Sequence, residues 1–156
     1  MRRAFELNGF DVIESCIINN KNDISLIVKK REILDISGIE DVEKLSRELK
    51  DFVVEKHLDG KKIAIWGAGH RTLALLSIAQ INEISFIVDS ADFKQGKYSP
   101  VMHSKIVSPK TLGESDIDIV IVMVPGLYPD EVVKTIRSFS RVFEIYKLKD
   151  NKLIEA

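Results

Sequence analysis

From Lys61 onward, short apolar runs alternate with segments that have helical periodicity. The apolar runs are KKIAIWG, ISFIVDS, DIDIVIVMVP and RVFEIYKL, and the segments between them include HRTLALLSIAQI and YPDEVVKTIRSF. Strands that are apolar along their whole length are buried on both faces, which is typical of parallel sheets covered by helices. The sequence therefore predicts an α/β fold, a Rossmann-like parallel sheet with helices on both faces.

The residues before Lys61 follow a different pattern. Two β-rich runs, Phe10–Ile18 and Asp23–Lys30, flank the turn-forming residues NNKN and predict a β-hairpin. Apolar residues then recur every three or four positions from Gly38 to Leu58, which predicts a long amphipathic helix. We expect the hairpin and linker helix to occupy residues 1–58 and the Rossmann-like domain to occupy residues 59–156.

The charge balance limits the partners that the chain is expected to have. Its 23 Lys and Arg against 24 Asp and Glu give a net charge of −1, which does not favour nucleic acid or an anionic membrane. No apolar run approaches the roughly 20 residues that span a bilayer, and MRRAFELNGF lacks the apolar core of a secretory signal. Cys16 is the single cysteine, so an internal disulfide and a cysteine-based zinc site are excluded. We expect a cytoplasmic protein with no metal site.

A glycine-rich turn follows the first of the apolar runs. Gly67, Ala68 and Gly69 let the backbone turn tightly and let a ligand approach, and a helix is expected directly afterwards. Its free amides, with Arg71 and Thr72, favour a phosphate. Thr72 stands where the dinucleotide fingerprint has a third glycine, so the turn predicts a phosphate or nucleotide rather than NAD specifically. A tight turn without a ligand is the alternative.

Asp89 ends the next apolar run, about twenty residues beyond the glycines. An acidic residue at that place in a Rossmann fold accepts hydrogen bonds from ribose hydroxyls. It is equally suited to cap the turn that follows.

Cations and hydrogen-bond donors are concentrated between Asp92 and Pro109. In a chain that is otherwise neutral, such a local excess suits a diphosphate or a sugar, although a solvated loop has the same composition. The candidate binding residues here are Lys94, Gln95, Gly96, Lys97, Tyr98 and His103.

These motifs together resemble a known family. The order GAG-x-R-T, then FIVDS, then FKQGKYSPVMHSKIVSP is similar to the C-terminal domain of the sugar C-methyltransferases, which use S-adenosylmethionine to modify nucleotide-linked sugars. The positions that keep the family's register are Gly67, Ala68, Asp89, Lys94, Gln95, Gly96, Pro100, His103, Ile106 and Pro109. Arg71 replaces the family's usual lysine, which keeps the charge but changes its geometry. ELNGFDVIES and ISLIVKK also resemble the segment that joins the family's catalytic and C-terminal domains.

The resemblance implies that residues 59–156 bind a nucleotide-sugar or a related phosphorylated small molecule. It also implies that the S-adenosylmethionine site, the zinc-binding domain and the Glu–His catalytic pair lie outside these 156 residues, on a partner domain or another segment. We therefore expect no catalytic residue and no cofactor in this chain. Two alternatives remain: an NAD(H)-binding redox enzyme or sensor, and a degenerate scaffold that forms a homodimer through its hairpin and the Gly38–Leu58 helix.

Overall fold

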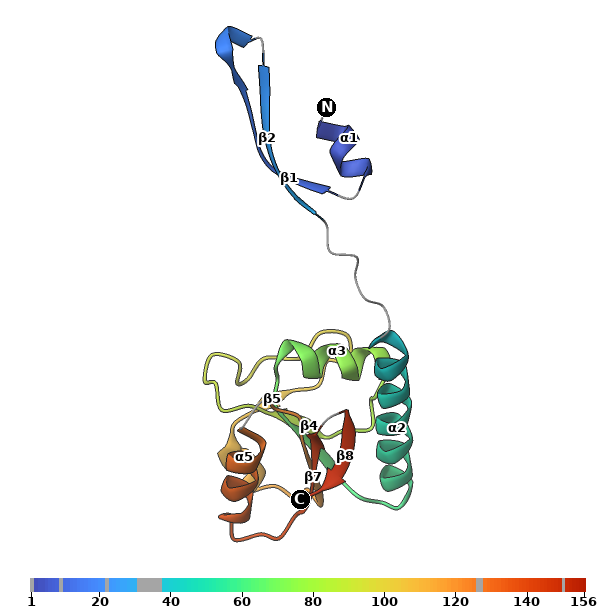
Figure 1. Cartoon of the computed structure of the whole chain (residues 1–156). Coiled ribbons are helices and arrows are strands. Elements are labelled where there is room, and N and C mark those ends of the chain that lie inside the picture. Colours follow the sequence, from blue (N-terminus) through green and yellow to red (C-terminus); the bar gives the residue numbers. More distant parts are fainter. Residues whose placement is uncertain (1, 9, 22, 31–37, 126–127, 150) are drawn as a thin grey trace. The chain divides into compact units, whose positions relative to one another are not determined.

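A computed structural model gives the fold and describes residues 2–8, 10–21, 23–30, 38–125, 128–149 and 151–156 (Figure 1). The chain forms two compact units, residues 1–36 and residues 37–156, and each is described by itself. The second unit holds the candidate ligand-binding residues, so the first is described only briefly.

The N-terminal unit consists of a short helix and a hairpin. Helix α1 (Arg2–Leu7) precedes strands β1 (Phe10–Ile18) and β2 (Asp23–Lys30), which pair antiparallel around the turn η1 (Asn19–Lys21). The rings of Phe5 and Phe10 meet edge to face with centroids 6.0 Å apart, which holds α1 against the hairpin. The two strands have the bounds that the sequence predicts, because alternation and the Asn-rich turn are local signals.

Large apolar side chains remain exposed on both faces of the hairpin. Ile17 lies opposite Ile24 in the register, and these side chains are 64% and 52% exposed. Ile18 and Ile27, which the alternation of side chains places on the other face, are 44% and 56% exposed. Because an isolated hairpin is marginal in water, these faces require a further apolar surface.

The second unit is built on a six-stranded sheet with the order β5-β4-β3-β6-β7-β8. All neighbouring strands pair parallel except β7 and β8, which form an antiparallel edge. This is the doubly wound order in which the chain reverses direction across the sheet between the two central strands, β3 and β6. The bounds of the strands are β3 (Ile63–Trp66), β4 (Phe86–Val88), β5 (Ile106–Val107), β6 (Ile119–Val122), β7 (Glu144–Lys149) and β8 (Lys152–Glu155).

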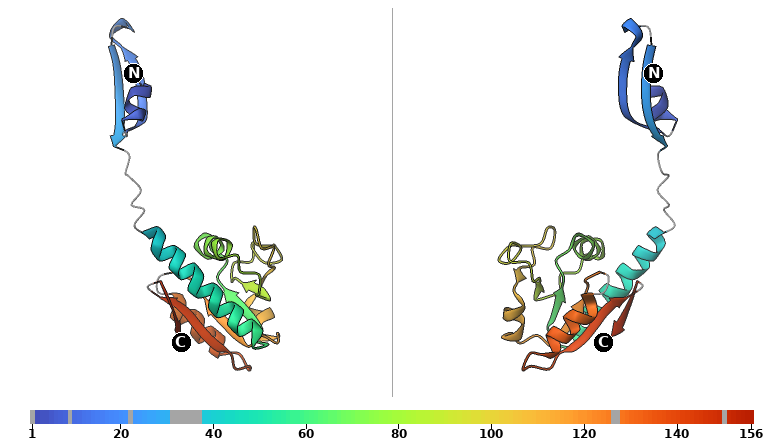
Figure 2. Two further views of the ribbon diagram at one scale, coloured as in Figure 1. Left: turned by 90° about the vertical axis from the view of Figure 1, so that its right-hand side faces the viewer. Right: turned by 60° about the vertical axis from the view of Figure 1, so that its left-hand side comes forward.

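Each face of this sheet carries its own apolar core. Alternate residues of β3 and β6 point to opposite faces, and both strands are buried along their whole length. One core lies under α2 (Gly38–Leu58) and α3 (His70–Ala79), and the other lies under α4 (Pro109–Gly113) and α5 (Tyr128–Arg137). Figures 1 and 2 show α2 and α5 on opposite sides of the sheet. The expected Rossmann-like fold, with helices on both faces, is confirmed.

The long helix α2 packs with the sheet unit. Leu45, Leu49 and Val53 are 6%, 1% and 0% exposed and belong to the same core as α3. The ring of Phe52 meets Tyr146 of β7 with centroids 4.7 Å apart. The division between the units therefore falls before α2, whereas the sequence pattern predicts that residues 1–58 form one N-terminal part with this helix in it. Periodicity identified the apolar stripe of the helix but not the surface that the stripe covers.

Two elements of the sheet unit were not predicted from the sequence. Helix α4 begins at Pro109 and is capped by Ser108, whose hydroxyl accepts the N–H of Thr111. Strand β8 pairs with β7 through the turn at Asn151, which has φ of +56°. Both elements are short and lack a periodic pattern. Helix α4 depends on its cap, and strand β8 depends on its pairing with β7.

Shortening Leu49 to alanine tests the packing of α2. We expect Leu49→Ala to lower the free energy of unfolding by about 2–5 kcal/mol, because it removes a buried side chain and leaves a cavity. Urea unfolding of the full chain measures the change. The matched control is Leu58→Ala, the same substitution in the same helix at a side chain that is 79% exposed, where we expect a change below about 0.5 kcal/mol. Equal effects of the two substitutions would contradict this packing.

Candidate functional site

The glycine turn lies at the carboxyl end of β3, beside the carboxyl end of β6. Gly67 has φ of +119°, and its N–H donates to the carbonyl of Val88 at 2.8 Å. A Cβ placed on Gly67 would lie 2.9 Å from Val124 Cγ1 and 3.4 Å from the backbone of Met123. Glycine is therefore required at residue 67 both by the backbone conformation and by the close approach of the neighbouring segment.

The second glycine of the turn has open space beside it. Gly69 is the N-cap of α3 with φ of −82°, and no side chain caps the helix there. A Cβ on Gly69 would meet nothing within 4 Å. The start of α3 therefore presents backbone amides and the positive end of the helix dipole beside a place where a ligand can approach.

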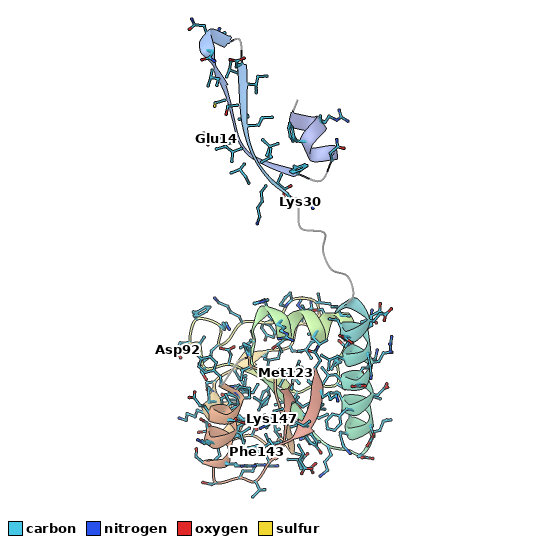
Figure 3. The ribbon with its side chains drawn as sticks, in the orientation of Figure 1. Glu14, Lys30, Asp92, Met123, Phe143 and Lys147 are labelled. Atoms are coloured by element: carbon cyan, nitrogen blue, oxygen red, sulfur yellow. The ribbon has the colours of Figure 1, made fainter. Side chains whose placement is uncertain are left out.

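Thr72 and Arg71, which the sequence predicts to bind phosphate, both have hydrogen-bond partners within the protein. Thr72 is 3% exposed, and its hydroxyl donates to the carbonyl of Met123 at 2.9 Å. Because the hydroxyl proton is used in this hydrogen bond inside the protein, Thr72 links α3 to the end of β6 and does not point to a ligand. The Arg71 side chain is exposed and donates to Asn151 Oδ1 at 3.2 Å. Figure 3 labels Met123 among the side chains of the sheet unit.

Asp89 connects the glycine turn to the loop that follows β4. Its Oδ2 accepts the N–H of Ala68 at 2.8 Å and the ammonium of Lys94 at 3.0 Å, and its Oδ1 accepts the N–H of Ala91 at 2.9 Å. Gln95 donates to the Asp89 carbonyl at 3.1 Å. The bond from Ala91 is the turn-capping role that the sequence offered as an alternative, and both carboxylate oxygens are engaged within the protein.

Burial and hydrogen bonding act in opposite directions on the pKa of Asp89. Burial of the carboxyl raises its pKa, but the hydrogen bonds from Ala91, Lys94 and Ala68 and the charge of Lys94 together outweigh it. The net result is a pKa below the usual value for aspartate. The carboxylate is therefore charged at neutral pH and holds Lys94 next to the glycine turn.

The loop from Asp92 to Lys105 carries the remaining candidate residues. Gly96 has φ of +78°, and its N–H donates to the carbonyl of Ile106 at 2.8 Å. Tyr98 forms an isolated bridge with Lys105, and its side chain is 61% exposed. Lys97 and His103 are also exposed, and His103 has φ of +51°. These side chains face solvent, on a loop whose backbone is fixed by its own hydrogen bonds.

Phe93, at the start of this loop, was not singled out from the sequence. Its side chain is 72% exposed, and the ammonium groups of Lys94 and Lys97 lie 5.8 and 6.0 Å from the centre of its ring. Figure 3 labels the neighbouring Asp92 on this loop, at the outside of the unit. The only sequence signal would have been an aromatic residue directly before a run of cations.

The structure thus brings together part of the predicted set. Gly67, Ala68, Asp89, Lys94 and Gln95 form one connected group at the carboxyl ends of β3 and β4. Among the described residues, no hydrogen bond or ion pair joins Lys97, Tyr98 or His103 to the glycine turn. Two hollows of about 250 and 320 Å³ lie away from the connected group, one between α2 and α3 beside Ser46 and one beside Phe143.

Among the residues that the structure describes, no group of three or more His, Cys, Asp or Glu side chains is arranged to hold a metal ion. No helix within the described ranges combines the length and apolar character needed to cross a bilayer.

Replacing Asp89 by asparagine tests the connection between the turn and the loop. The asparagine amide has one oxygen and one NH₂ group, so in either orientation the NH₂ group faces at least one of the three donors, Ala68, Ala91 and Lys94. We therefore expect Asp89→Asn to lower the free energy of unfolding by about 1–3 kcal/mol at pH 7. Because the folded state lowers the pKa of Asp89, its stabilisation is complete above the unfolded pKa of about 3.9 and is lost as the pH falls through the folded value. The difference between wild type and variant should therefore shrink below about pH 4.

Urea unfolding from pH 7 to pH 3 measures this difference. The matched control is Asp92→Asn, the same change on the same loop at an exposed carboxylate with one long hydrogen bond to Gln95 at 3.4 Å. We expect less than about 0.5 kcal/mol for the control. A difference for Asp89→Asn that stays constant down to pH 3 would contradict the role of the carboxylate charge.

Comparisons with solved structures give distant similarities. The chain is 14% identical to a protein described as RSP, a Rex-family repressor, with a TM-score of 0.43, covering 78% of this chain and 84% of that one. It is 11% identical to the structure described as RSP in complex with β-NADH, with a TM-score of 0.43, covering 77% of this chain and 82% of that one. No curated protein matches the chain.

A comparison with protein families gives a specific result. The family described as the C-methyltransferase C-terminal domain matches residues 39–142, a range that includes the glycine turn, Asp89 and the cation-rich loop. This range begins within α2 and ends before β7, so the match covers the sheet unit except for β7 and β8 and does not include the hairpin. The chain therefore belongs to the family of C-methyltransferase C-terminal domains.

Proposed function

We propose that the sheet unit binds a nucleotide-sugar or a related phosphorylated small molecule that is the substrate of a methyl transfer. The observation that carries this proposal is the uncapped start of α3 at Gly69, with open space beside it and Lys94 held close by through Asp89. An anion at a helix start beside a cation is stabilised by backbone amides, by the helix dipole and by the ion pair. The reversal of the strand order between β3 and β6 makes this the crevice where doubly wound folds bind ligands.

Individual residues have distinct roles in this proposal. Gly67 sets the turn, and Gly69 lets the ligand approach the backbone. Lys94 neutralises a phosphate, while Asp89 and Gln95 hold the loop that carries Lys94 in place. From the exposed part of the loop, the side chains Lys97, Tyr98 and His103 would contact the diphosphate or the sugar.

The chain contributes binding rather than the chemical step in this proposal. We assign no catalytic residue to it, and S-adenosylmethionine would be bound by a partner domain. The methyl acceptor would be the ligand bound by the sheet unit, and the partner domain would supply the methyl group.

A binding experiment tests the proposal directly. Titration calorimetry of the full chain with UDP-glucose, dTDP-glucose and GDP-mannose should give saturable heat with at least one of them. Gly69→Ala should reduce that affinity at least about tenfold, because its methyl group fills the space at the start of α3. It should cost less than about 1 kcal/mol of stability, since φ of −82° suits alanine.

The contrasting variant is Gly67→Ala in the same turn. Its methyl group would collide with Val124 and would require a strained φ of +119°, so we expect a loss of about 1–3 kcal/mol in the free energy of unfolding. Absence of heat with all three nucleotide-sugars would refute the proposed function. If Gly69→Ala binds the nucleotide-sugar with unchanged affinity, the start of α3 is not part of the binding site.

NADH is the informative competing ligand. Binding of NAD(H) by a Rossmann fold uses a fingerprint whose third glycine lets the helix pack closely on the strand, and Thr72 stands at that position in this chain. We therefore place NAD(H) second. Enhancement of NADH fluorescence on mixing with the protein, together with no heat from the nucleotide-sugars, would reverse this order.

The exposed isoleucines of the hairpin favour a second role in assembly. Ile17 and Ile24 form an adjacent exposed pair in the register, and a second copy of the chain would cover them. We expect light scattering to give the mass of a dimer for the wild type and of a monomer for Ile17→Lys/Ile24→Lys. Unchanged calorimetric binding in that variant would show that the sheet unit is intact. A monomeric wild type would contradict homodimer formation.

A further inference from the structure

The exposed ring of Phe93 has surroundings that distinguish it from an isolated apolar side chain on the surface. It is 72% exposed although it lies five residues from the buried end of β4. Two ammonium groups, from Lys94 and Lys97, lie within 6.0 Å of its ring centre. An aromatic face beside two cations matches the two parts of a nucleoside diphosphate, a flat base and an anionic diphosphate.

A continuous series of contacts leads from the glycine turn to this ring. The N–H of Ala68 donates to Asp89 Oδ2 at 2.8 Å, and the same oxygen accepts Lys94 Nζ at 3.0 Å. Lys94 Nζ in turn lies 5.8 Å from the ring centre of Phe93. Two hydrogen bonds therefore hold Lys94 beside the glycine turn, and the ring of Phe93 lies within cation–π distance of the same ammonium.

The place of the ring in the fold agrees with the direction of a bound nucleotide. In a doubly wound fold the phosphates lie at the helix start after the first strand, and the ribose lies near the end of the second strand. These are the start of α3 and the end of β4 in this chain. The base extends from the ribose away from the phosphates, which directs it toward the loop after β4, where Phe93 lies.

We propose, resting on the proposed function, that the nucleobase of the ligand stacks on Phe93 while Lys94 and Lys97 contact the diphosphate. The ligand class is then a nucleoside diphosphate derivative and not a sugar phosphate alone. Stacking tolerates every base because each has a flat π face, so the identity of the base is selected weakly by this contact.

Calorimetry with whole ligands and their parts tests the stacking role. The probes are UDP-glucose, dTDP-glucose and GDP-mannose, the corresponding nucleoside diphosphates, and glucose 1-phosphate and mannose 1-phosphate. Phe93→Ala should weaken the nucleotide-sugar that binds and its nucleoside diphosphate by about tenfold each, and leave any binding of the sugar phosphate unchanged. Phe93→Tyr keeps the flat ring and should bind within about twofold of wild type.

The outcomes separate this inference from the proposed function. If the wild type binds none of the nucleotides, the proposed function fails and the stacking role fails with it. If the wild type and Phe93→Ala bind a nucleotide-sugar equally, only the stacking role is overturned. If Phe93→Ala weakens the nucleotide-sugar but not the nucleoside diphosphate, the ring contacts the sugar, which also overturns the assignment to the base.

A fluorescent variant gives a readout that does not depend on affinity. Phe93→Trp places an exposed indole at the proposed platform, and stacking of a base should quench its emission. The control is Val142→Trp, at a site that is 92% exposed and precedes β7, at the amino end of the strands. Nucleotide should quench Phe93→Trp and leave the emission of Val142→Trp unchanged. Equal quenching of the two variants, or none in Phe93→Trp at saturating nucleotide, would overturn the proposal.

Discussion

The close approach of Gly67 to the Val124 side chain and to the Met123 backbone is the constraint on which the glycine turn depends. It brings the ends of the two central strands together where the strand order reverses. Because a side chain at residue 67 would collide there, glycine is what allows the chain to turn directly from β3 into the start of α3. The position of Asp89 beside Ala68, and of Lys94 beside Asp89, follows from this turn.

Asp89 shows how one carboxylate can organise a loop from within the protein. Its three donors come from the glycine turn, from the adjacent turn and from a lysine side chain, so it joins segments that are 21 residues apart. In the proposed function, a ligand phosphate that reaches Lys94 would have to share this cation with Asp89. In a chain of near-neutral charge, such binding would depend on this local exchange between two acceptors.

The fold was largely predictable from the sequence, whereas the site was predictable only in part. The hairpin strands and α2 were predicted with the bounds that the structure gives, since alternation, turn residues and helical spacing are local signals. Short elements such as α4 and β8 were missed because a cap or a neighbouring strand defines them. The residue types singled out Gly67 and Lys94, which the structure brings into one connected group. The inward bond of Thr72 and the exposed ring of Phe93 depend on tertiary contacts that spacing does not reveal.

Thr72 makes the start of α3 part of the packed interior. A glycine at that position of a dinucleotide-binding fold allows the helix to pack closely on the sheet, but here a buried side chain fills the space. Its hydroxyl donates to the Met123 carbonyl and so links the first turn of α3 to the end of β6 from the inside. The helix start that the proposed function assigns to an anion is therefore held in place by an internal contact and needs no ligand to position it.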